Sequence, residues 1–335
     1  MRKYILPLGI LIFLGFALYG AYSVSNYLYA PIHKPGREKI IRIRSGWTFD
    51  RVAQYLLRED IIRSPLRFKL MAKLTDMAST VKAGEYEVDT SWSRMELLSH
   101  LKEGDVRLHR LQIPEGLAWW ETARRVADSG LASFRGFAAQ VRNQELLDQY
   151  GIPGPTAEGF LYPETYYFSR SEDQSAKRIV SKMLEQFRKE TDRELWPDQR
   201  PEDARLHRIV TLASLVEKET SVPKERPIVA GVFQNRLRRG MRLQCDPTII
   251  YGLGRDFDGN LRTKDLRDAD NPYNTYQHTG LPPSPICSPG LDSLKAAEEP
   301  AEHDYLYFVA TKNGTHVFSR NLRQHNKAVR KHQLR

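Results

Sequence analysis

Residues 210–220 read VTLASLVEKET, and this stretch says most about the fold and chemistry of the chain. Apolar residues three and four positions apart share one face of a helix, so the stretch is predicted to be a helix with one buried stripe. Glu217 and Glu219 flank that stripe on opposite sides, because residues two apart do not share a face. The periodicity makes both carboxyl groups half-buried and does not choose between them. The stripe consists of Ile209, Leu212, Ala213 and Val216.

Either glutamate could act as a general acid. A carboxyl group against apolar side chains has a raised pKa, which a general acid needs near neutral pH. The alternative is that both are boundary residues, paired with nearby bases such as Lys218 or Arg208. The helix pattern leaves both interpretations open.

The segment that follows, residues 242–254, reads RLQCDPTIIYGLG. Asp246 and Pro247 are typical of a helix start, with Asp246 as the N-cap and Pro247 in the first turn. Three neighbouring residues could hydrogen-bond a sugar or simply pack: Gln244, Thr248 and Tyr251.

Residues 271–290 read NPYNTYQHTGLPPSPICSPG and predict a stiff, ordered loop, because proline and glycine oppose both helix and strand. Long ordered loops on a rigid scaffold often form binding sites. Tyr273, Asn274 and Tyr276 suit contacts with sugars, or else they anchor the loop.

Two further carboxylates lie in an aromatic setting. Residues 158–166 read EGFLYPETY and contain Glu158 and Glu164. Each is either a second carboxylate of a reaction or half of an ion pair that anchors a loop. No nucleotide-binding glycine motif, zinc-binding HExxH, GxSxG elbow or penicillin-binding SxxK set is found. We therefore expect neither a metal nor a cofactor.

The chain begins with a membrane-type segment. Residues 4–29 contain no charge, and residues 5–22 are almost wholly apolar. About 20 such residues span a bilayer as a helix. A cleaved signal peptide is the alternative, but no small-residue cleavage site follows the segment. We expect a single-pass anchor in the inner (plasma) membrane, with the N-terminus in the cytoplasm and the large downstream part outside it.

The formal net charge is +10 in 335 residues. For a domain outside the cytoplasm, an anionic envelope polymer or lipid surface is a better partner than nucleic acid. No basic-aromatic block tracks a nucleic-acid strand, so nucleic-acid binding is not expected. A solvated basic surface is the other interpretation. Cys245 and Cys287 match no redox or zinc motif, and could form one disulfide in an oxidising compartment.

The rest of the chain predicts short, mixed elements. A linker at residues 31–39 precedes a strand–helix–helix–strand–helix order that resembles a LysM-type carbohydrate-binding module, although many small α+β units share that order. A strand, a glycine and a helix recur 70 residues apart, at Gly46 with Ala53 and at Gly116 with Ala123. The elements expected in the first module are a strand at 40–44, helices at 48–58 and 65–73, a strand at 82–88 and a helix at 93–102. Further on we expect a strand at 107–113, helices at 171–191, 206–219 and 226–239, a loop at 195–203, a hairpin around Asn313-Gly314, and a helix from 322.

The collinear runs LVEKET, ERPIVAGVFQNRLRRGMRLQCDPTIIYGLG, YNTYQHTGLPPSPICSPG and YLYFVATKNGTHVFS resemble the YceG/MltG family of endolytic murein transglycosylases. His325-Asn326 near the end fits as well. The resemblance covers essentially the whole chain. It implies an α+β fold: a cytoplasmic stub and transmembrane anchor at 1–30, a small LysM-like βααβ domain at 39–105, and a larger mixed α+β catalytic domain at 107–335.

The resemblance also implies roles for residues. Glu219, the second glutamate of the EKET motif, would be the catalytic acid/base, and Glu217 would support it. Gln244, Asp246, Asn274 and Tyr276 would line the glycan groove. The family is not expected to have cysteine at positions 245 and 287, so a bond between them would tether two loops of the site.

The implied reaction cleaves the MurNAc–GlcNAc bond of peptidoglycan near the membrane and leaves 1,6-anhydroMurNAc ends, which would end glycan chain growth. Peptidoglycan synthases are expected partners. One rival is a hydrolase that uses Glu158 or Glu164 as its second carboxylate. Another is a non-catalytic scaffold that binds the cell wall.

Overall fold

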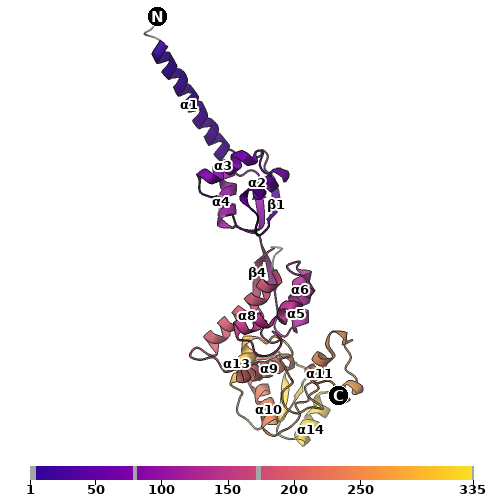
Figure 1. The fold of residues 1–335 in the computed structure, drawn as a ribbon. Helices are drawn as coiled ribbons and strands as arrows, with labels where there is room; N and C mark the ends of the chain where they lie inside the picture. The colour runs from indigo at the N-terminus through magenta and orange to yellow at the C-terminus, as the bar shows by residue number, and fades with distance from the viewer. Residues whose placement is uncertain (1–4, 78–80, 171–174, 334–335) are drawn as a thin grey trace. The chain divides into compact units, whose positions relative to one another are not determined.

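The computed structural model describes residues 5–77, 81–170 and 175–333 (Figure 1). The chain divides into two compact units. One comprises Met1–His109 with Tyr167–Ser175, and the other comprises Arg110–Tyr166 with Ala176–Arg335. Each unit is described by itself.

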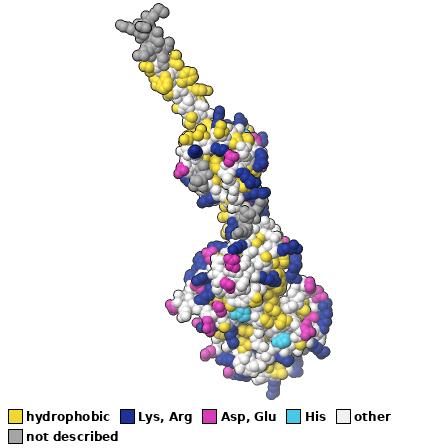
Figure 2. All heavy atoms as spheres, in the orientation of Figure 1, with side chains coloured by type: hydrophobic (Ala, Val, Ile, Leu, Met, Phe, Trp, Pro, Cys, Tyr) yellow, Lys and Arg dark blue, Asp and Glu magenta, His cyan; other side chains and the backbone are white. Residues whose placement is uncertain are grey.

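The first helix, α1, spans Ile5–Tyr29. Its segment Ile10–Tyr29 is apolar enough to cross a membrane, and its apolar window contains no buried residue. Figure 2 shows the hydrophobic side chains along it. Twenty residues extend about 30 Å along a helix axis, which matches the hydrocarbon core of a bilayer. The helix is compatible with the expected single-pass anchor, and a signal sequence would have the same helix.

The rest of the first unit is a two-stranded sheet with three helices. β1 (Glu38–Ile43) pairs antiparallel with β2 (Gly84–Asp89), with Glu38 opposite Asp89 and Ile43 opposite Gly84. Each helix begins where a side-chain oxygen accepts from its first turn. The helices are α2 (Phe49–Arg58), α3 (Pro65–Leu74) and α4 (Arg94–Glu103), capped by Thr48, Ser64 and Ser93. The element order expected from the sequence is confirmed, and the assignment to LysM-like domains stays a prediction.

The predicted repeat is present as local structure. Gly46 and Gly116 both adopt a left-handed backbone, with φ of +75° and +78°, before the next helix. Ala53 and Ala123 are fully buried in the two helices. The second copy consists of β3 (Leu108–Gln112) and α5 (Trp119–Asp128), and β3 pairs with β4 (Thr165–Ser169).

The second unit is built around α9 (Asp203–Glu219), which α10 (Arg226–Arg238), α11 (Asp246–Leu253) and α13 (Leu291–Glu298) contact. Residues 209–216 of α9 are all buried. The four residues of the predicted stripe are buried as expected, but the other residues of this segment are buried as well, because neighbouring helices cover this part of α9 on all its faces. Two polar residues inside it bond its own backbone: Thr211 Oγ1 donates to His207 O, and Ser214 Oγ donates to Thr211 O.

The remaining elements surround this centre. The helix expected at 171–191 is α8 (Ser175–Glu194), and its predicted start at 171–174 lies outside the described residues. The C-terminal helix is α14 (Leu322–His332), as predicted. The other elements are α6 (Phe134–Val141), α7 (Gln144–Tyr150), η2 (Pro223–Glu225), η3 (Gly254–Asp256) and α12 (Thr263–Arg267).

The predicted hairpin is confirmed with a different turn. β5 (Tyr307–Ala310) pairs antiparallel with β6 (His316–Ser319). Gly314 has φ of +76°, whereas Asn313 does not have a positive φ. A two-residue Asn-Gly turn would need a positive φ at both residues. Instead, Gly314 N–H donates to Thr311 O and Thr311 N–H donates to Thr315 O, so the loop is one residue longer.

Candidate active site

Glu219 is the last residue of α9 and opens into a cavity of about 410 Å³, here called the Glu219 pocket. Its walls come from α10, the segment before and into α11, the 271–290 loop, the hairpin and α14. The polar residues that line it with Glu219 include Arg236, Gln244, Asp246, Tyr276, His316 and His325.

The environment of Glu219 favours the protonated acid. Burial raises the pKa of its carboxyl, and the nearby Asp246 raises it further. A hydrogen bond from Cys245 and the charges of His316 and Arg236 offset part of this rise. The Cys245 thiol donates to Glu219 Oε1 at 2.9 Å. A carboxyl with a raised pKa can give up a proton and take it back near neutral pH.

The Cys245 thiol keeps its proton. Burial raises the pKa of Cys245 well above its usual value, and the charge of Glu219 adds to the effect. A buried thiol of this kind is a hydrogen-bond donor rather than a nucleophile. Cys287 is also buried, and its thiol donates to Ser214 O at 3.4 Å. Both cysteines are free, so the disulfide considered from the sequence is not formed.

Asp246 is not the N-cap of α11 that the sequence predicted. The N-cap of α11 is Cys245, without a side-chain hydrogen bond, and Asp246 is the first helical residue. Its Oδ1 accepts from Tyr276 Oη at 2.7 Å, a bond between two residues of the Glu219 pocket. The N-cap prediction for Asp246 is therefore wrong, because the tyrosine hydroxyl occupies the carboxylate. Gln244 precedes this turn with a φ of +52° and is exposed in the pocket wall.

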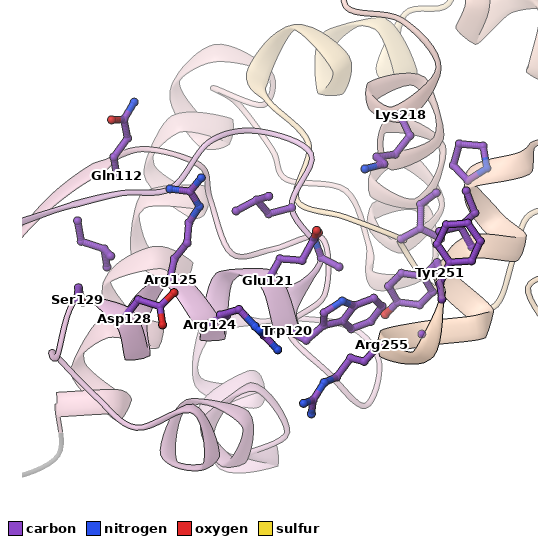
Figure 3. Close-up of a pocket in the computed structure, with 18 of the residues that line it drawn as sticks. Gln112, Trp120, Glu121, Arg124, Arg125, Asp128, Ser129, Lys218, Tyr251 and Arg255 are labelled. Atoms are coloured by element: carbon purple, nitrogen blue, oxygen red, sulfur yellow. The ribbon is translucent and has the colours of Figure 1, made fainter. Parts of the chain in front are cut away.

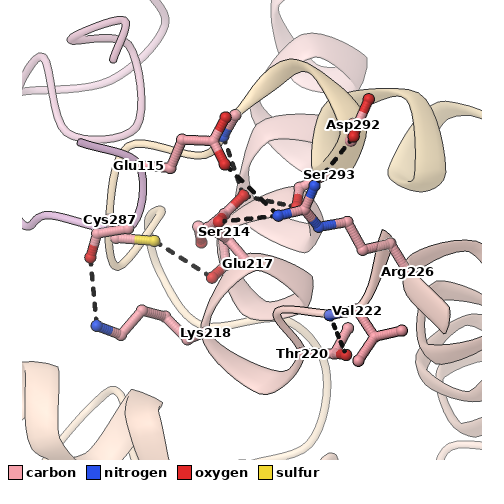
Figure 4. A network of polar contacts seen from close by, with 12 residues as sticks. Glu115, Ser214, Glu217, Lys218, Thr220, Val222, Arg226, Cys287, Asp292 and Ser293 are labelled. Carbon is pink, nitrogen blue, oxygen red and sulfur yellow. Dashed lines mark hydrogen bonds and ion pairs between the residues drawn. The ribbon is translucent and has the colours of Figure 1, made fainter. Parts of the chain in front are cut away.

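Glu217 points away from the Glu219 pocket, into a network of polar contacts (Figure 4). Its Oε2 accepts from Gly290 N–H at 3.0 Å and from Ser293 Oγ at 2.6 Å, at the N-terminus of α13. Arg226 Nη2 lies 3.5 Å from its Oε1. A carboxylate is stabilised there by the helix dipole and by these donors. The geometry thus separates two glutamates that the periodicity left equivalent.

Arg226 completes this network. Its guanidinium is mostly buried and lies 3.5 Å from Glu115 Oε2 and 3.2 Å from Asp292 Oδ2. The partner of Glu217 is therefore Arg226 and neither of the bases considered from the sequence. Lys218 instead donates to Gly116 O at 3.2 Å.

Glu158 is fully buried away from the Glu219 pocket. Its carboxylate accepts from Trp119 N–H and Tyr251 Oη, both at 3.0 Å, and from Gly159 N–H. Burial raises the pKa of Glu158 to about 7 against the effect of these donors. All three are neutral donors, so Glu158 is not half of an ion pair, which was one of the two interpretations of the sequence. Glu164 is exposed, and its Oε1 accepts from the N–H of the next residue, Thr165.

Two other residues predicted for the site do not line the Glu219 pocket. Thr248 is fully buried and its Oγ1 contacts Cys245 O and Thr275 Oγ1. Asn274 is fully buried, and its Nδ2 donates to three backbone carbonyls of residues 265–268. Both side chains are saturated inside the protein, so they hold loops in place rather than face a ligand.

Among the residues of the Glu219 pocket that were not singled out from the sequence are His316 and Arg236. His316 Nδ1 lies 2.7 Å from Glu225 Oε2, and its backbone N–H donates to Glu225 Oε1. Burial alone would raise the pKa of Glu225, but these bonds lower it. Arg236 donates to the carbonyls of Leu306 and Leu243 and keeps a positive charge at the pocket. The sequence shows only that His316 begins a strand, so it offers no signal for the contact with Glu225.

A second cavity, of about 820 Å³, is drawn in Figure 3. It is called the basic groove here. Pro247 lines both cavities, and Lys218, the neighbour of Glu219, lines the basic groove. Its other main features are Arg110, Trp120, Arg124, Arg125, Tyr251 and Arg255.

Comparison with known proteins agrees with this architecture. A model of the YceG-like family matches residues 41–331. An endolytic murein transglycosylase of Bacillus subtilis (strain 168) is 32% identical over 329 residues, covering 93% of this chain and 90% of that protein. One from Streptococcus pneumoniae (strain D39) is 28% identical, covering 96% of this chain and 64% of that protein. The chain belongs to the YceG-like family, as its motifs predict.

A solved structure supports the same assignment. The 2.6 Å crystal structure of lmo1499, described as a yceG-like protein from Listeria monocytogenes, aligns with a TM-score of 0.58. It is 31% identical and the alignment covers 87% of this chain and 99% of that one.

Proposed function

We propose that this chain is an endolytic murein transglycosylase that cuts peptidoglycan strands at the MurNAc–GlcNAc bond, with Glu219 as its single acid/base. The observation that carries the proposal is the position of Glu219: a carboxyl with a raised pKa at the wall of an open pocket. Membership of a family whose relatives bear that name supports the activity.

Glu219 would act twice. As an acid, it protonates the glycosidic oxygen that leaves with N-acetylglucosamine, and the C1–O bond breaks through an oxocarbenium-like transition state. The acetamido group of the sugar shields C1. The ionised Glu219 then takes the proton of the C6 hydroxyl as that oxygen bonds to C1. The product is a 1,6-anhydro sugar, the proton is returned to Glu219, and no water is consumed.

Other groups in the pocket suit this reaction. Asp246 adds negative charge beside the region where positive charge develops, which stabilises an oxocarbenium ion. Tyr276 fixes the orientation of Asp246 through its hydroxyl. Arg236 and His316 oppose the pKa rise at Glu219, which keeps its two protonation states accessible.

A hydrolase would use water and a second carboxylate on the other side of the bond. The two candidates considered from the sequence do not line the Glu219 pocket: Glu158 is buried behind Tyr251, and Glu164 bonds its neighbour. Asp246 is the carboxylate that shares the pocket with Glu219. The structure of the product ends separates the two reactions.

The cellular setting is part of the proposal. The apolar α1 would anchor the chain in the inner membrane with its N-terminus in the cytoplasm, and both units would work outside the cytoplasm, close to newly made glycan. The first unit would bind glycan as a LysM-like domain. Cleavage there would end chain growth, in association with peptidoglycan synthases. A scaffold without catalysis would bind the polymer and leave it intact.

The test compares the full-length chain, its Glu219→Gln variant and its Glu164→Gln variant on purified peptidoglycan in detergent. Mass spectrometry of released fragments should find 1,6-anhydro-muramic ends with the wild type and Glu164→Gln, and none with Glu219→Gln. Reducing ends would mean a hydrolase. Binding without cleavage by the wild type would favour the scaffold.

A further inference from the structure

We propose that the basic groove is a subsite for the carboxylates of the peptide stems that hang from the glycan strand. The inference rests on the proposed function, because it takes the polymer in the Glu219 pocket to be peptidoglycan. It assigns the groove a ligand class of its own: short acidic peptides attached to an uncharged sugar backbone.

The charge of the groove is the first observation. Five cationic side chains line it, against Glu121 and Asp128. Glu121 Oε2 already accepts from Ala118 N–H at 2.8 Å, at the start of α5. The cations are Arg110, Arg124, Arg125, Lys218 and Arg255. The groove therefore carries an excess of positive charge that an anionic ligand can neutralise.

The arginines are free to bind. Arg124 and Arg125 are exposed on α5, and within the described part of the chain neither has a carboxylate at ion-pair distance. Figure 3 shows Arg124 beside Trp120 and Arg255, with Arg125 nearer to Gln112. A guanidinium binds a carboxylate through two parallel N–H donors, so two adjacent arginines without an ion-pair partner suit a ligand with more than one carboxylate.

The aromatic floor is the second observation. The rings of Trp120 and Tyr251 lie 4.8 Å apart, and Tyr251 contacts Tyr273 at the same distance. The buried Glu158 holds this floor, because it accepts from both Tyr251 Oη and Trp119 N–H. Aromatic faces with a polar tip suit the apolar faces of sugar rings. Glu158 is thus a positioning residue of the groove.

Continuity with the Glu219 pocket is the third observation. Pro247 lines both cavities, and one turn of α11 separates Asp246 in the pocket from Ile250 and Tyr251 in the groove. A polymer that crosses the Glu219 pocket therefore continues into the groove. In peptidoglycan the muramic lactyl group is joined to the peptide as an amide, so the negative charge of the strand lies in the stem carboxylates. The basic groove matches that part of the polymer.

The experiment uses the full-length chain and two substrates: glycan strands that keep their stems, and the same strands stripped of stems by an amidase. The lactyl carboxylates that the amidase frees are then capped as methylamides, so that the stripped backbone is uncharged. The variants are Arg124→Glu/Arg125→Glu and a matched control, Arg188→Glu/Lys189→Glu, which reverses two adjacent exposed charges on α8. We expect kcat/KM on stem-bearing strands to fall about tenfold in the groove variant, from the loss of exposed charge pairs and added repulsion. Stripped strands should be cleaved at the wild-type rate, and the control should match the wild type on both.

Equal losses on both substrates, or no loss on either, would overturn the proposal. A binding measurement keeps it separate from the proposed reaction. The free stem peptide L-Ala-D-Glu-diaminopimelate should bind the wild type and Glu219→Gln equally, and bind the groove variant about tenfold more weakly. Vesicles with anionic phospholipid, and inorganic polyphosphate, are the competing sources of anions. If the groove variant loses affinity for these while stem binding is unchanged, the proposal is wrong even where cleavage is confirmed.

Discussion

The hydrogen bond from Cys245 to Glu219 gives the sharpest test of how the site tunes its acid. Cys245→Ala removes the donor from Glu219 Oε1, whereas Cys245→Ser replaces the thiol with a stronger hydroxyl donor. A donor stabilises the ionised carboxylate and lowers its pKa. We therefore expect the pKa of Glu219 to rise in the alanine variant and to fall in the serine variant.

The size of the shift follows from the bond. Hydrogen bonds to charged groups contribute about 1.5–3 kcal/mol, and a thiol is a weak donor, so about 1 kcal/mol is a fair value here. One pKa unit corresponds to about 1.4 kcal/mol, so the loss of this bond in the alanine variant should raise the pKa enough to be resolved in a pH profile.

The pH dependence of kcat/KM reports this shift. Glu219 must be protonated to donate, so the rate falls as pH rises through its pKa. The alkaline limb should move up with Cys245→Ala and down with Cys245→Ser. Cys287→Ala is the matched control, because the same change is made at a buried thiol that bonds Ser214 O instead. The reasoning is refuted if the limb stays in place, or if Cys287→Ala moves it equally.

Three further predictions concern stability, measured by urea unfolding of the full-length chain. Arg226→Ala should lower the free energy of unfolding by about 3 kcal/mol, because the buried carboxylate of Glu217 loses its charged partner; a loss under about 1 kcal/mol would contradict this. Gly159→Ala should cost about 3 kcal/mol, since its φ is +86° and a Cβ would lie 2.5 Å from Pro285 Cβ, whereas Gly240→Ala, at φ +63° in open space, should cost only about 1–2 kcal/mol; equal losses would refute the steric argument. Burial raises the pKa of Glu158 from 4.5 to about 7 in the folded chain. The protonated Glu158 therefore stabilises the fold at low pH, and the free energy of unfolding falls by about 2–3 kcal/mol as pH rises from about 4.5 to 7. Glu158→Gln should remove that loss, and an unchanged pH profile would show that Glu158 is ionised in the fold.

Local signals carried most of the fold prediction. Thr48 and Ser93 begin helices because their side chains bond the first turn, a contact within three residues. Gly314 supplies the left-handed residue that a hairpin loop needs. The number of faces that α9 buries could not be read from its own residues, because it depends on α10, α11 and α13.

The site depended on contacts far apart in the sequence. The hydrogen bond from Gly290, 73 residues along the chain, is what distinguishes the environment of Glu217 from that of Glu219. The pairing of His316 with Glu225 spans 91 residues. The local sequence predicts Asp246 as a helix cap, but its carboxylate accepts a hydrogen bond from Tyr276, 30 residues away. Spacing within one helix could not select the carboxyl group of the pocket, and only the family resemblance pointed to Glu219.

The most direct test of the central claim is the origin of the oxygen at the new ends. The full-length chain is incubated with purified peptidoglycan in water enriched in heavy oxygen, and the fragments are analysed by mass spectrometry. If Glu219 accepts the proton of the C6 hydroxyl and that oxygen, rather than water, attacks C1, the new ends are 1,6-anhydro sugars without heavy oxygen. The Glu219→Gln variant should form none. Reducing ends that carry one heavy oxygen would contradict the account and identify a hydrolase.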